Sequence, residues 1–358
     1  MSWADKDYKY KKKITIDNTK VAGNETDFPV LVSITDGDLA DTSNGGHVQS
    51  SNGYDIVFYD STESVLLDHE IQRYINTTGE IIMWVRLPNI YGAVDTVFYM
   101  YFGKPGVVID PSTTSTWDAN YVAVYHMKDI TTSTIVDSTI NGNDGTKSSA
   151  NNPIQADGKI GYAQDFSNDV INCGNDNSLD VTNLTVEAWF NAQTLGVGSN
   201  SPRIAGIELS NSGFPWAVEG VDNNKILLYI NVGAGEVRCS YIPFDWAGGT
   251  EWNTWFHGAW TFTSGSQTAY KNTVAGTSAS RVGSLNNQNY NLRIGNSDNG
   301  NRDWDGLLDE IRISDMVRSA NWITTCYNNQ NSPSTFMGIG GVITKPATMT
   351  LTGTMHFE

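Results

Sequence analysis

The stretch that most constrains the fold is residues 305–329, DGLLDEIRISDMVRSANWITTCYNN. Its first half alternates apolar and polar residues, which predicts a strand with one apolar face. The apolar positions of that face are Leu307, Ile311 and Ile313. Asp309 falls on the same face, where it needs a partner because burying a bare charge is costly. Ser319 then provides an N-cap for the only good helical pattern in the chain, so we predict an inner strand followed by a short helix.

The rest of the chain indicates many short strands joined by turns. Charged residues make up 17% of its 358 residues, while Gly, Thr and Asn are frequent. Apolar segments at regular spacing between polar turns are typical of β-sandwiches. In the first part the expected strands are 11–17, 28–34, 55–59, 66–74, 80–87 and 96–102. The length is sufficient for two domains of ordinary size, so we predict an all-β protein with two domains.

Charge and hydropathy exclude some partners. The formal net charge is −17, so a polyanion such as DNA would be repelled. No apolar run approaches the length of a membrane span, and we expect no signal peptide because the first residues lack an apolar core. The three cysteines, Cys173, Cys239 and Cys326, have no short spacing, which argues against a zinc ribbon and a disulfide-rich scaffold. We expect buried free thiols.

Six segments between residues 4 and 108 resemble a family known as the domain of unknown function 2341 (DUF2341). The segments are 10–17 (YKKKITID), 27–32 (DFPVLV), 55–58 (DIVF), 67–71 (LDHEI), 84–88 (WVRLP) and 95–103 (DTVFYMYFG). The resemblance lies in their order, spacing and joint presence. It implies that residues 4–108 form a small β-sandwich, without an established activity.

Asp68, His69 and Glu70 are the residues of this first part that most suggest chemistry. Neighbouring residues on a strand point to opposite faces. We therefore expect Asp68 and Glu70 to share one side and His69 to face away. This arrangement favours a hydrogen-bonding role over a catalytic or metal-binding cluster.

After a polar linker at residues 109–118, the chain resembles the laminin-G-like, concanavalin A-like jelly rolls over residues 119–341. The matching segments are 136–145 (VDSTINGNDG), 159–166 (KIGYAQDF), 184–190 (LTVEAWF), 255–262 (WFHGAWTF), 270–274 (YKNTV), 292–296 (LRIGN) and the strand 306–313 (GLLDEIRI). The resemblance implies two β-sandwich (jelly-roll) domains in tandem, with one short C-terminal helix in the second. This fold carries lectins, adhesion modules and glycosidases, so it does not fix a function.

The loop 137–145 is rich in oxygen ligands suited to Ca²⁺. In the resembling family, a calcium ion often lies where this loop meets the strand that contains the LDE motif. The resemblance therefore implies a structural Ca²⁺ held by Asp137, Asn143 and Asp309. The alternative is a hydrogen-bonded Asx-turn without a metal, and the sequence leaves both interpretations open. The lack of a His or Cys cluster argues against zinc.

Three tryptophans of the second domain lie in loop-like contexts, namely Trp216, Trp246 and Trp304. Carbohydrate sites often combine an exposed aromatic face with hydrogen-bonding groups, so these residues are the predicted sugar-binding set. The competing interpretation for each is packing in the core.

The sequence argues against an enzyme. There is no E-x-D-x-x-E strand to aim paired acids into a groove, and Glu187 is an isolated acid in its strand. Retaining glycosidases need two carboxyl groups about 5 Å apart. The nucleophile motif G-x-S-x-G is also absent.

The last segment, residues 342–358, lies outside both resemblances. Its apolar residues alternate with polar ones, which predicts a half-buried strand. These residues are Met349, Leu351, Met355 and Phe357. A lone strand is not stable by itself, so we expect it to support assembly by adding a strand to another subunit or to a virion partner.

Together these patterns predict a non-enzymatic surface recognition or adhesion protein whose lectin-like jelly roll binds a surface glycan or glycoprotein. The expected setting is extracellular or a virion surface, as in a phage decoration or fibre protein. The alternatives are a secreted prokaryotic cell-surface adhesin and a glycoside hydrolase or lyase of the concanavalin A-like class.

Overall fold

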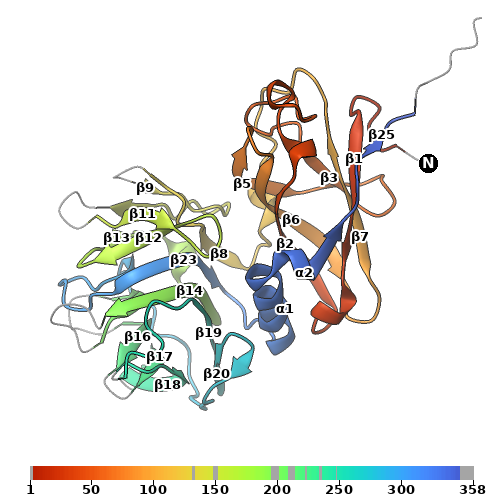
Figure 1. Ribbon diagram of the computed structural model, residues 1–358. Helices are drawn as coiled ribbons and strands as arrows, with labels where there is room; N and C mark the ends of the chain where they lie inside the picture. Colours follow the sequence, from red (N-terminus) through yellow and green to blue (C-terminus); the bar gives the residue numbers. More distant parts are fainter. Residues whose placement is uncertain are drawn as a thin grey trace, which may run out of the picture.

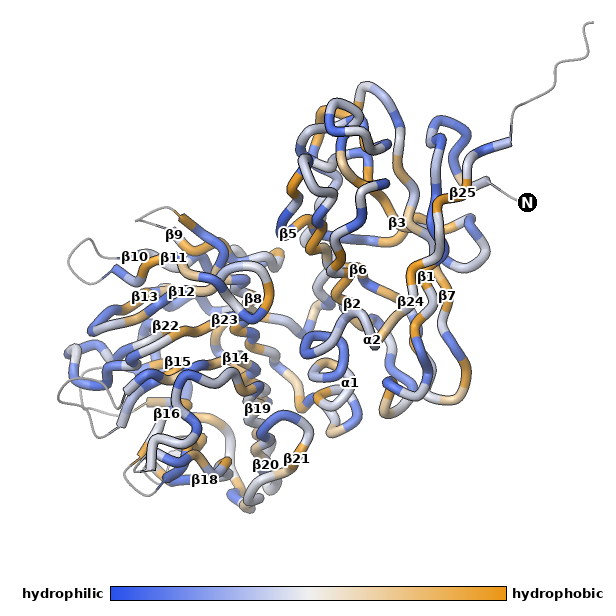
Figure 2. The backbone as a smooth tube through the Cα atoms, in the orientation of Figure 1, coloured by the Kyte–Doolittle hydropathy of each residue, from blue (hydrophilic) through white to orange (hydrophobic). Residues whose placement is uncertain are grey.

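The protein consists of two β-sandwiches with helix α1 (Ala320–Asn331) between them (Figure 1). The computed structural model describes residues 3–130, 134–147, 152–194, 201–208, 214–221, 224–233, 236–246 and 248–346. Within these ranges only α1 and the short α2 (Pro333–Phe336) are α-helices, so the all-β prediction with a C-terminal helix is confirmed. Neither helix is long and apolar enough to span a membrane. Figure 2 shows hydrophobic residues concentrated on the strands and hydrophilic residues in the connecting loops.

The first sandwich pairs a six-stranded sheet, in the order β24-β1-β7-β3-β4 with β25 also on β1, with a three-stranded sheet, β2-β6-β5. The six strands are β1 (Tyr10–Ile16), β3 (Val57–Tyr59), β4 (Leu66–Leu67), β7 (Thr96–Phe102), β24 (Met337–Ile339) and β25 (Ile343–Thr344). The three strands are β2 (Glu25–Thr35), β5 (His69–Ile75) and β6 (Glu80–Ile90).

The second sandwich is a jelly roll of two eight-stranded sheets. The inner sheet runs β11-β12-β23-β14-β19-β20-β21, with β8 also paired to β23, and it lies nearer α1 (Figure 1). Its strands are β8 (Tyr121–Tyr125), β11 (Ile154–Asp157), β12 (Tyr162–Ser167), β14 (Leu184–Thr194), β19 (Phe256–Thr263), β20 (Ser266–Lys271), β21 (Val274–Ala275) and β23 (Asp305–Ser314). The outer sheet runs β18-β17-β16-β15-β22-β13-β10-β9. Its strands are β9 (Thr134–Ile135), β10 (Gly145–Lys147), β13 (Ile171–Asn172), β15 (Arg203–Ile207), β16 (Trp216–Val221), β17 (Lys225–Asn231), β18 (Glu236–Pro243) and β22 (Leu292–Ile294).

The two ends of the described chain meet in one sheet. β24 and β25 both pair antiparallel with β1, next to which they are drawn in Figure 1. Residues 337–341, which the sequence pattern placed at the exit of the jelly roll, thus return to the first sandwich. The predicted tail begins in the same way, since Ile343 pairs with Lys11. The alternating part of that tail, residues 347–358, lies outside the described residues.

Helix α1 covers the edge strand β2. The side chain of Asn329 acts like a neighbouring strand, because its Oδ1 accepts from Leu31 N at 2.7 Å and its Nδ2 donates to Leu31 O at 3.0 Å. Thr325 Oγ1 accepts from Ala22 N at 3.0 Å. An uncovered edge would offer unpaired backbone groups to other chains. The helix expected from the jelly-roll pattern therefore closes the first sandwich.

Strand β23 differs from the predicted alternation. Glu310 has a φ of 49°, and two residues of β23 stand opposite one residue of β14 at this point, which is a β-bulge. The bulge reverses which side chains face the core. The side chains that pack in the jelly-roll core are Leu308, Ile311 and Ile313. The prediction that Leu307 and Asp309 share this face is wrong, because Leu307 is only half-buried and Asp309 accepts a hydrogen bond from Ile160 N at 2.8 Å outside this core.

The two sandwiches share buried apolar contacts. The hydrophobic cluster of the first sandwich includes Tyr121 and Val124 from β8 of the jelly roll, as well as Trp322 from α1. Phe28 and Trp322 meet edge to face, with ring centroids 4.8 Å apart. The sandwiches are therefore joined by a continuous core rather than by a flexible linker.

Candidate functional site

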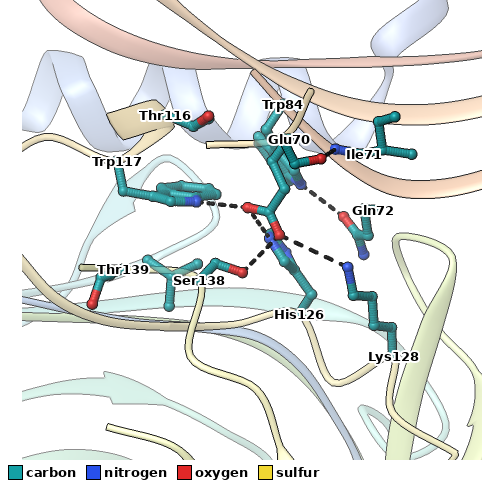
Figure 3. Close-up of polar contacts among 12 residues, drawn as sticks. Glu70, Ile71, Gln72, Trp84, Thr116, Trp117, His126, Lys128, Ser138 and Thr139 are labelled. Carbon is teal, nitrogen blue, oxygen red and sulfur yellow. Dashed lines mark hydrogen bonds and ion pairs between the residues drawn. The ribbon is translucent and has the colours of Figure 1, made fainter. Parts of the chain in front are cut away.

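The most developed polar constellation lies where β5 faces the jelly roll (Figure 3). Because side chains alternate on β5, His69 points into the first sandwich and is buried against Phe58, while Glu70 points toward the jelly roll. Burial lowers the pKa of His69, so it is neutral at pH 7. The expected separation of His69 from Glu70 is therefore present, and these residues form no joint cluster.

Glu70 connects the two sandwiches. One carboxylate oxygen accepts from Ser138 Oγ at 2.8 Å, and the other accepts from Trp117 Nε1 at 2.8 Å and lies 3.3 Å from His126 Nε2. Lys128 Nζ is 3.8 Å away. Burial alone would raise the pKa of Glu70, but His126 and the other donors hold it at about 2. The carboxylate is therefore ionised under all ordinary conditions.

His126 lies between two carboxylates, and we call Glu70, His126, Glu310 and Arg312 the interdomain network. His126 Nδ1 is 2.7 Å from Glu310 Oε1, and Glu310 Oε2 accepts from Arg312 at 2.8 Å. Burial would lower the pKa of His126, but the charges of Glu310 and Glu70 raise it to about 9. His126 thus carries a positive charge at neutral pH and is 2% exposed.

Two tryptophans enclose the interdomain network. The ring of Trp84 stacks on His126 with centroids 5.8 Å apart, and the guanidinium of Arg312 lies 4.2 Å from the Trp84 ring. Trp117 lies beside Trp84, with ring centroids 5.5 Å apart, and its ring is 4.9 Å from the same guanidinium. A histidine that is protonated at neutral pH is a poor general base there, and carboxylates with lowered pKa values are poor general acids. The chemistry of this network is therefore to hold the domains together.

Asp309 and Glu310 are the adjacent acids that most resemble a catalytic pair. Burial and the neighbouring Glu310 charge raise the pKa of Asp309 well above its usual range. The pKa of Glu310 is lowered, since His126 and Arg312 outweigh its burial. Carboxyl groups with divergent pKa values are a pattern found in active sites. However, both side chains are at most 1% exposed beneath the first sandwich, so a polysaccharide does not reach them in this conformation.

The predicted calcium ligands Asp137, Asn143 and Asp309 have protein partners. Asp137 Oδ1 accepts from the backbone N of Val124 and Thr139, and its Oδ2 accepts from Asn143 N at 2.8 Å and from the Thr139 hydroxyl. Asn143 Nδ2 donates to Val122 O at 2.8 Å. This is the geometry of the metal-free Asx-turn alternative.

An open polar hollow of about 440 Å³ adjoins this loop, between residues 142–144 and 173–177. It is bordered by amide and carboxylate side chains. Among the described residues, no group of three or more His, Cys, Asp or Glu side chains is arranged to hold a metal ion. Calcium binding at this loop therefore stays a prediction.

The predicted sugar-binding residues Trp216, Trp246 and Trp304 are all buried in the jelly-roll core. Trp216 opens β16 on its inward face, and Trp246 packs edge to face on Trp304 with centroids 6.2 Å apart. None of the three rings offers the exposed face that the prediction required. Their loop-like sequence contexts were misleading, because Trp216 begins a strand, and Trp246 and Trp304 lie in short connections whose side chains turn into the core.

A different aromatic residue is accessible on the jelly roll. Tyr241, at the end of β18, is half-buried and lines an open hollow of about 510 Å³, which we call the Tyr241 hollow. Its other lining residues are Pro243, Lys271, Asn272, Val274, Ala275, Gly276 and Thr277. The hollow lies where the edges of the two sheets are joined, since Thr277 N donates to Tyr241 O at 2.9 Å. Gly276 is required at this contact, because a Cβ there would be 2.3 Å from Tyr241 O.

The polar groups of the Tyr241 hollow are held in place. A hydrogen bond to Thr277 and the charge of Lys225 lower the pKa of the Tyr241 phenol, and Lys225 Nζ is 4.1 Å from the ring centroid. Lys271 Nζ donates to Pro243 O at 3.2 Å. The hollow thus combines an aromatic ring, apolar surface and positioned hydrogen-bonding groups, as small-molecule sites commonly do.

Two parts of the chain match known families. Residues 165–324 match the model of the concanavalin A-like lectin/glucanases superfamily, and residues 52–141 match that of the domain of unknown function DUF2341. Along the chain, the DUF2341 match comes first and the concanavalin A-like match second. Both resemblances drawn from the sequence are therefore confirmed. A comparison with curated proteins gives no match.

Several solved structures are similar to part of this chain. The binding domain of Paraclostridial Mosquitocidal Protein 1 is 14% identical with a TM-score of 0.46, over 58% of this chain and 52% of that chain. The binding domain of botulinum neurotoxin serotype G is 14% identical with a TM-score of 0.47, over 58% and 50%. Domain 4 of AbnA, a GH43 extracellular arabinanase from Geobacillus stearothermophilus solved with arabinotriose, is 22% identical with a TM-score of 0.45, over 58% and 98%. The chain spans about half the length of the two toxin structures.

Sequence reasoning missed both the interdomain network and the Tyr241 hollow. The network had a signal in Glu70 and Glu310, which are charged residues in otherwise strand-like segments. The hollow had none, because Tyr241 looks like an ordinary aromatic residue near the end of a strand.

Proposed function

We propose that the protein is a non-enzymatic recognition protein that binds a surface glycan through its lectin/glucanase-like jelly roll. The observation that carries this proposal is the Tyr241 hollow, with a partly exposed aromatic ring beside amide, ammonium and hydroxyl groups. A sugar has an apolar face and polar edges, and both find partners there. The superfamily match supports the proposal at the level of fold, which lectins and glucanases share.

The enzymatic alternative is less well supported. The adjacent acids Asp309 and Glu310 and the isolated Glu187 are all buried. The Glu187 side chain lies 3.5 Å from His257 Nε2 inside the structure. A hydrolase or lyase needs carboxyl groups that reach the glycosidic bond. Incubation with a panel of polysaccharides should yield no new reducing ends, and sustained turnover would favour the enzyme.

The binding proposal is tested with a glycan array probed by the full-length protein, followed by calorimetry on the glycans that bind. Replacing Tyr241 by Ala removes the ring without opening the core, because the side chain is half-exposed. We expect about a twofold to tenfold loss of affinity, because one aromatic contact contributes about 0.5–1.5 kcal/mol. Tyr54→Ala, a half-buried tyrosine of the first sandwich outside the Tyr241 hollow, is the matched control and should bind as the wild type does. Equal binding by the Tyr241 variant would refute the assignment of the site.

The biological setting proposed from the sequence is an extracellular or virion surface, as in a phage decoration or fibre protein. A secreted prokaryotic adhesin is the alternative. Neighbouring capsid or tail genes would support the first, and an export signal upstream in the reading frame would support the second.

A further inference from the structure

A cleft in the first sandwich has no role in the proposed glycan binding. It lies between the β3–β4 turn and the β6–β7 loop, has a volume of about 450 Å³, and we call it the β6–β7 cleft. Its apolar floor consists of Leu67, Leu87 and Phe98, which are buried, while Tyr91 and Val94 at its mouth are 41% and 59% exposed. Exposed apolar residues gathered around a concave surface mark an interaction site.

The charges near the cleft are already bonded within the first sandwich. Asp60 accepts hydrogen bonds from Ser64 N and Val65 N, both at 3.0 Å, so it holds its own turn. Asp95 accepts from Asn18 N at 3.1 Å. No lysine or arginine lines the cleft. Its apolar floor therefore suits an uncharged, apolar segment, and its two carboxylates disfavour an anion or an acidic peptide.

The chain itself contains such a segment. Residues 347–358, ATMTLTGTMHFE, carry large apolar residues at alternating positions and no Asp, Glu, Lys or Arg before Glu358. This is unusual in a protein with a net charge of −17, in which most surfaces repel their copies. An uncharged, alternating segment is suited to lay one row of side chains into an apolar cleft.

The segment and the cleft lie at opposite ends of the six-stranded sheet. The segment follows β25, which pairs with Tyr10 and Lys11, and Tyr10 stands opposite Phe102 on β7. The cleft is at the other end of β7, where Thr96 stands opposite Ile16. Ile16 lies six residues after Tyr10 on β1, which corresponds to about 20 Å. A donor at one end of a molecule and a receptor at the other join copies head to tail.

We propose that residues 347–358 of one copy bind the β6–β7 cleft of a second copy, so that the protein assembles into head-to-tail chains. Such contacts do not close upon themselves and allow open filaments. The glycan-binding hollow lies on the jelly roll, away from the β6–β7 cleft, so each added copy would add a binding site and increase avidity. The assembly does not depend on the proposed function and is measured without any glycan.

Two variants separate donor from receptor. Truncation after Pro346 removes the donor and leaves the described strands complete, while Val94→Asp places a charge at the mouth of the cleft. A charge buried in an apolar contact weakens binding by at least about a hundredfold. Val282→Asp is the matched control, because Val282 is 79% exposed on the jelly roll. Thermal unfolding of each variant verifies that it is folded.

Sedimentation velocity gives the decisive result. The wild type and Val282→Asp should gain mass as concentration rises, whereas the truncated chain and Val94→Asp should each stay monomeric. An equimolar mixture of the truncated chain and Val94→Asp should form a discrete heterodimer and nothing larger, because it contains one usable donor and one usable receptor. The proposal is overturned if the wild type is monomeric at all concentrations, if truncation leaves its association unchanged, or if the mixture stays monomeric.

Discussion

Replacing His126 by Gln should destabilise the protein by an amount that depends on pH. The substitution removes the cation between Glu70 and Glu310, which are 3.3 and 2.7 Å away. Removing one partner of a buried ion pair typically costs about 3–5 kcal/mol, because the remaining charges lose their compensation. We expect a loss of this size at about pH 6, where the wild-type imidazole is protonated in both the folded and unfolded states.

The pH dependence follows from the pKa of His126, which folding raises from 6.5 to about 9. A raised pKa means that the folded state binds the proton more tightly. The resulting stability is fully present below pH 6.5 and is lost as the pH rises toward 9. A shift of this size corresponds to about 3 kcal/mol. The free-energy gap between wild type and variant should therefore shrink by about that amount between pH 6 and pH 10.

The assay is guanidinium-induced unfolding followed by tryptophan fluorescence at a series of pH values. Glu80→Gln is a suitable control, because Glu80 on β6 forms a partly exposed ion pair with Arg73 on β5, with 3.1 Å between Glu80 Oε1 and Arg73 Nε. It should cost less than about 1 kcal/mol at every pH. A gap between wild type and the His126 variant that is the same at pH 6 and pH 10 would refute the reasoning.

Three further predictions concern local geometry. Asn329→Asp should lower the free energy of unfolding by about 2 kcal/mol, because a carboxylate accepts from Leu31 N but does not donate to Leu31 O; chemical denaturation measures this. Gly306→Ala should lower the melting temperature sharply, since Gly306 has a φ of 130° and a Cβ there would be 2.2 Å from Asn191 O. If the variant melts at the wild-type temperature, the neighbouring strands move apart to accommodate the Cβ and the reasoning is wrong. Asp137→Asn should lower the melting temperature by the same amount in calcium and in EDTA, because the hydrogen bonds of Asp137 hold the loop. A loss of stability that occurs only in calcium buffer would instead establish the metal site.

The elements that were predictable from the sequence depend on local patterns. Alternation and turn residues located most strands, and Ser319 does cap α1 by accepting from Trp322 N at 3.0 Å. The two family resemblances rest on the same kind of local signal. Local patterns are sufficient to locate a strand that alternates with a period of two and a helix that has an N-cap.

The parts that failed depend on geometry that local patterns do not contain. A single bulge at Glu310 reversed the faces of β23 and moved Asp309 out of the core. The burial of Trp246 and Trp304 depends on how the two sheets pack over the connections that carry these residues. The contact between Glu70 and His126 depends on how the two domains dock, so no spacing in the sequence predicts it.

The pairing of β1 with β24 and β25 has a consequence for synthesis. The chain leaves the first sandwich after β7 at Phe102 and returns only at Met337, so about 235 residues must emerge in between. At roughly 5–20 residues per second, the ribosome needs about 10–50 s to deliver them. During that interval β1 exposes a bare edge on the nascent chain, and the jelly roll is complete before the domain that precedes it. The first sandwich therefore reaches its full set of strands only after the jelly roll has been synthesised.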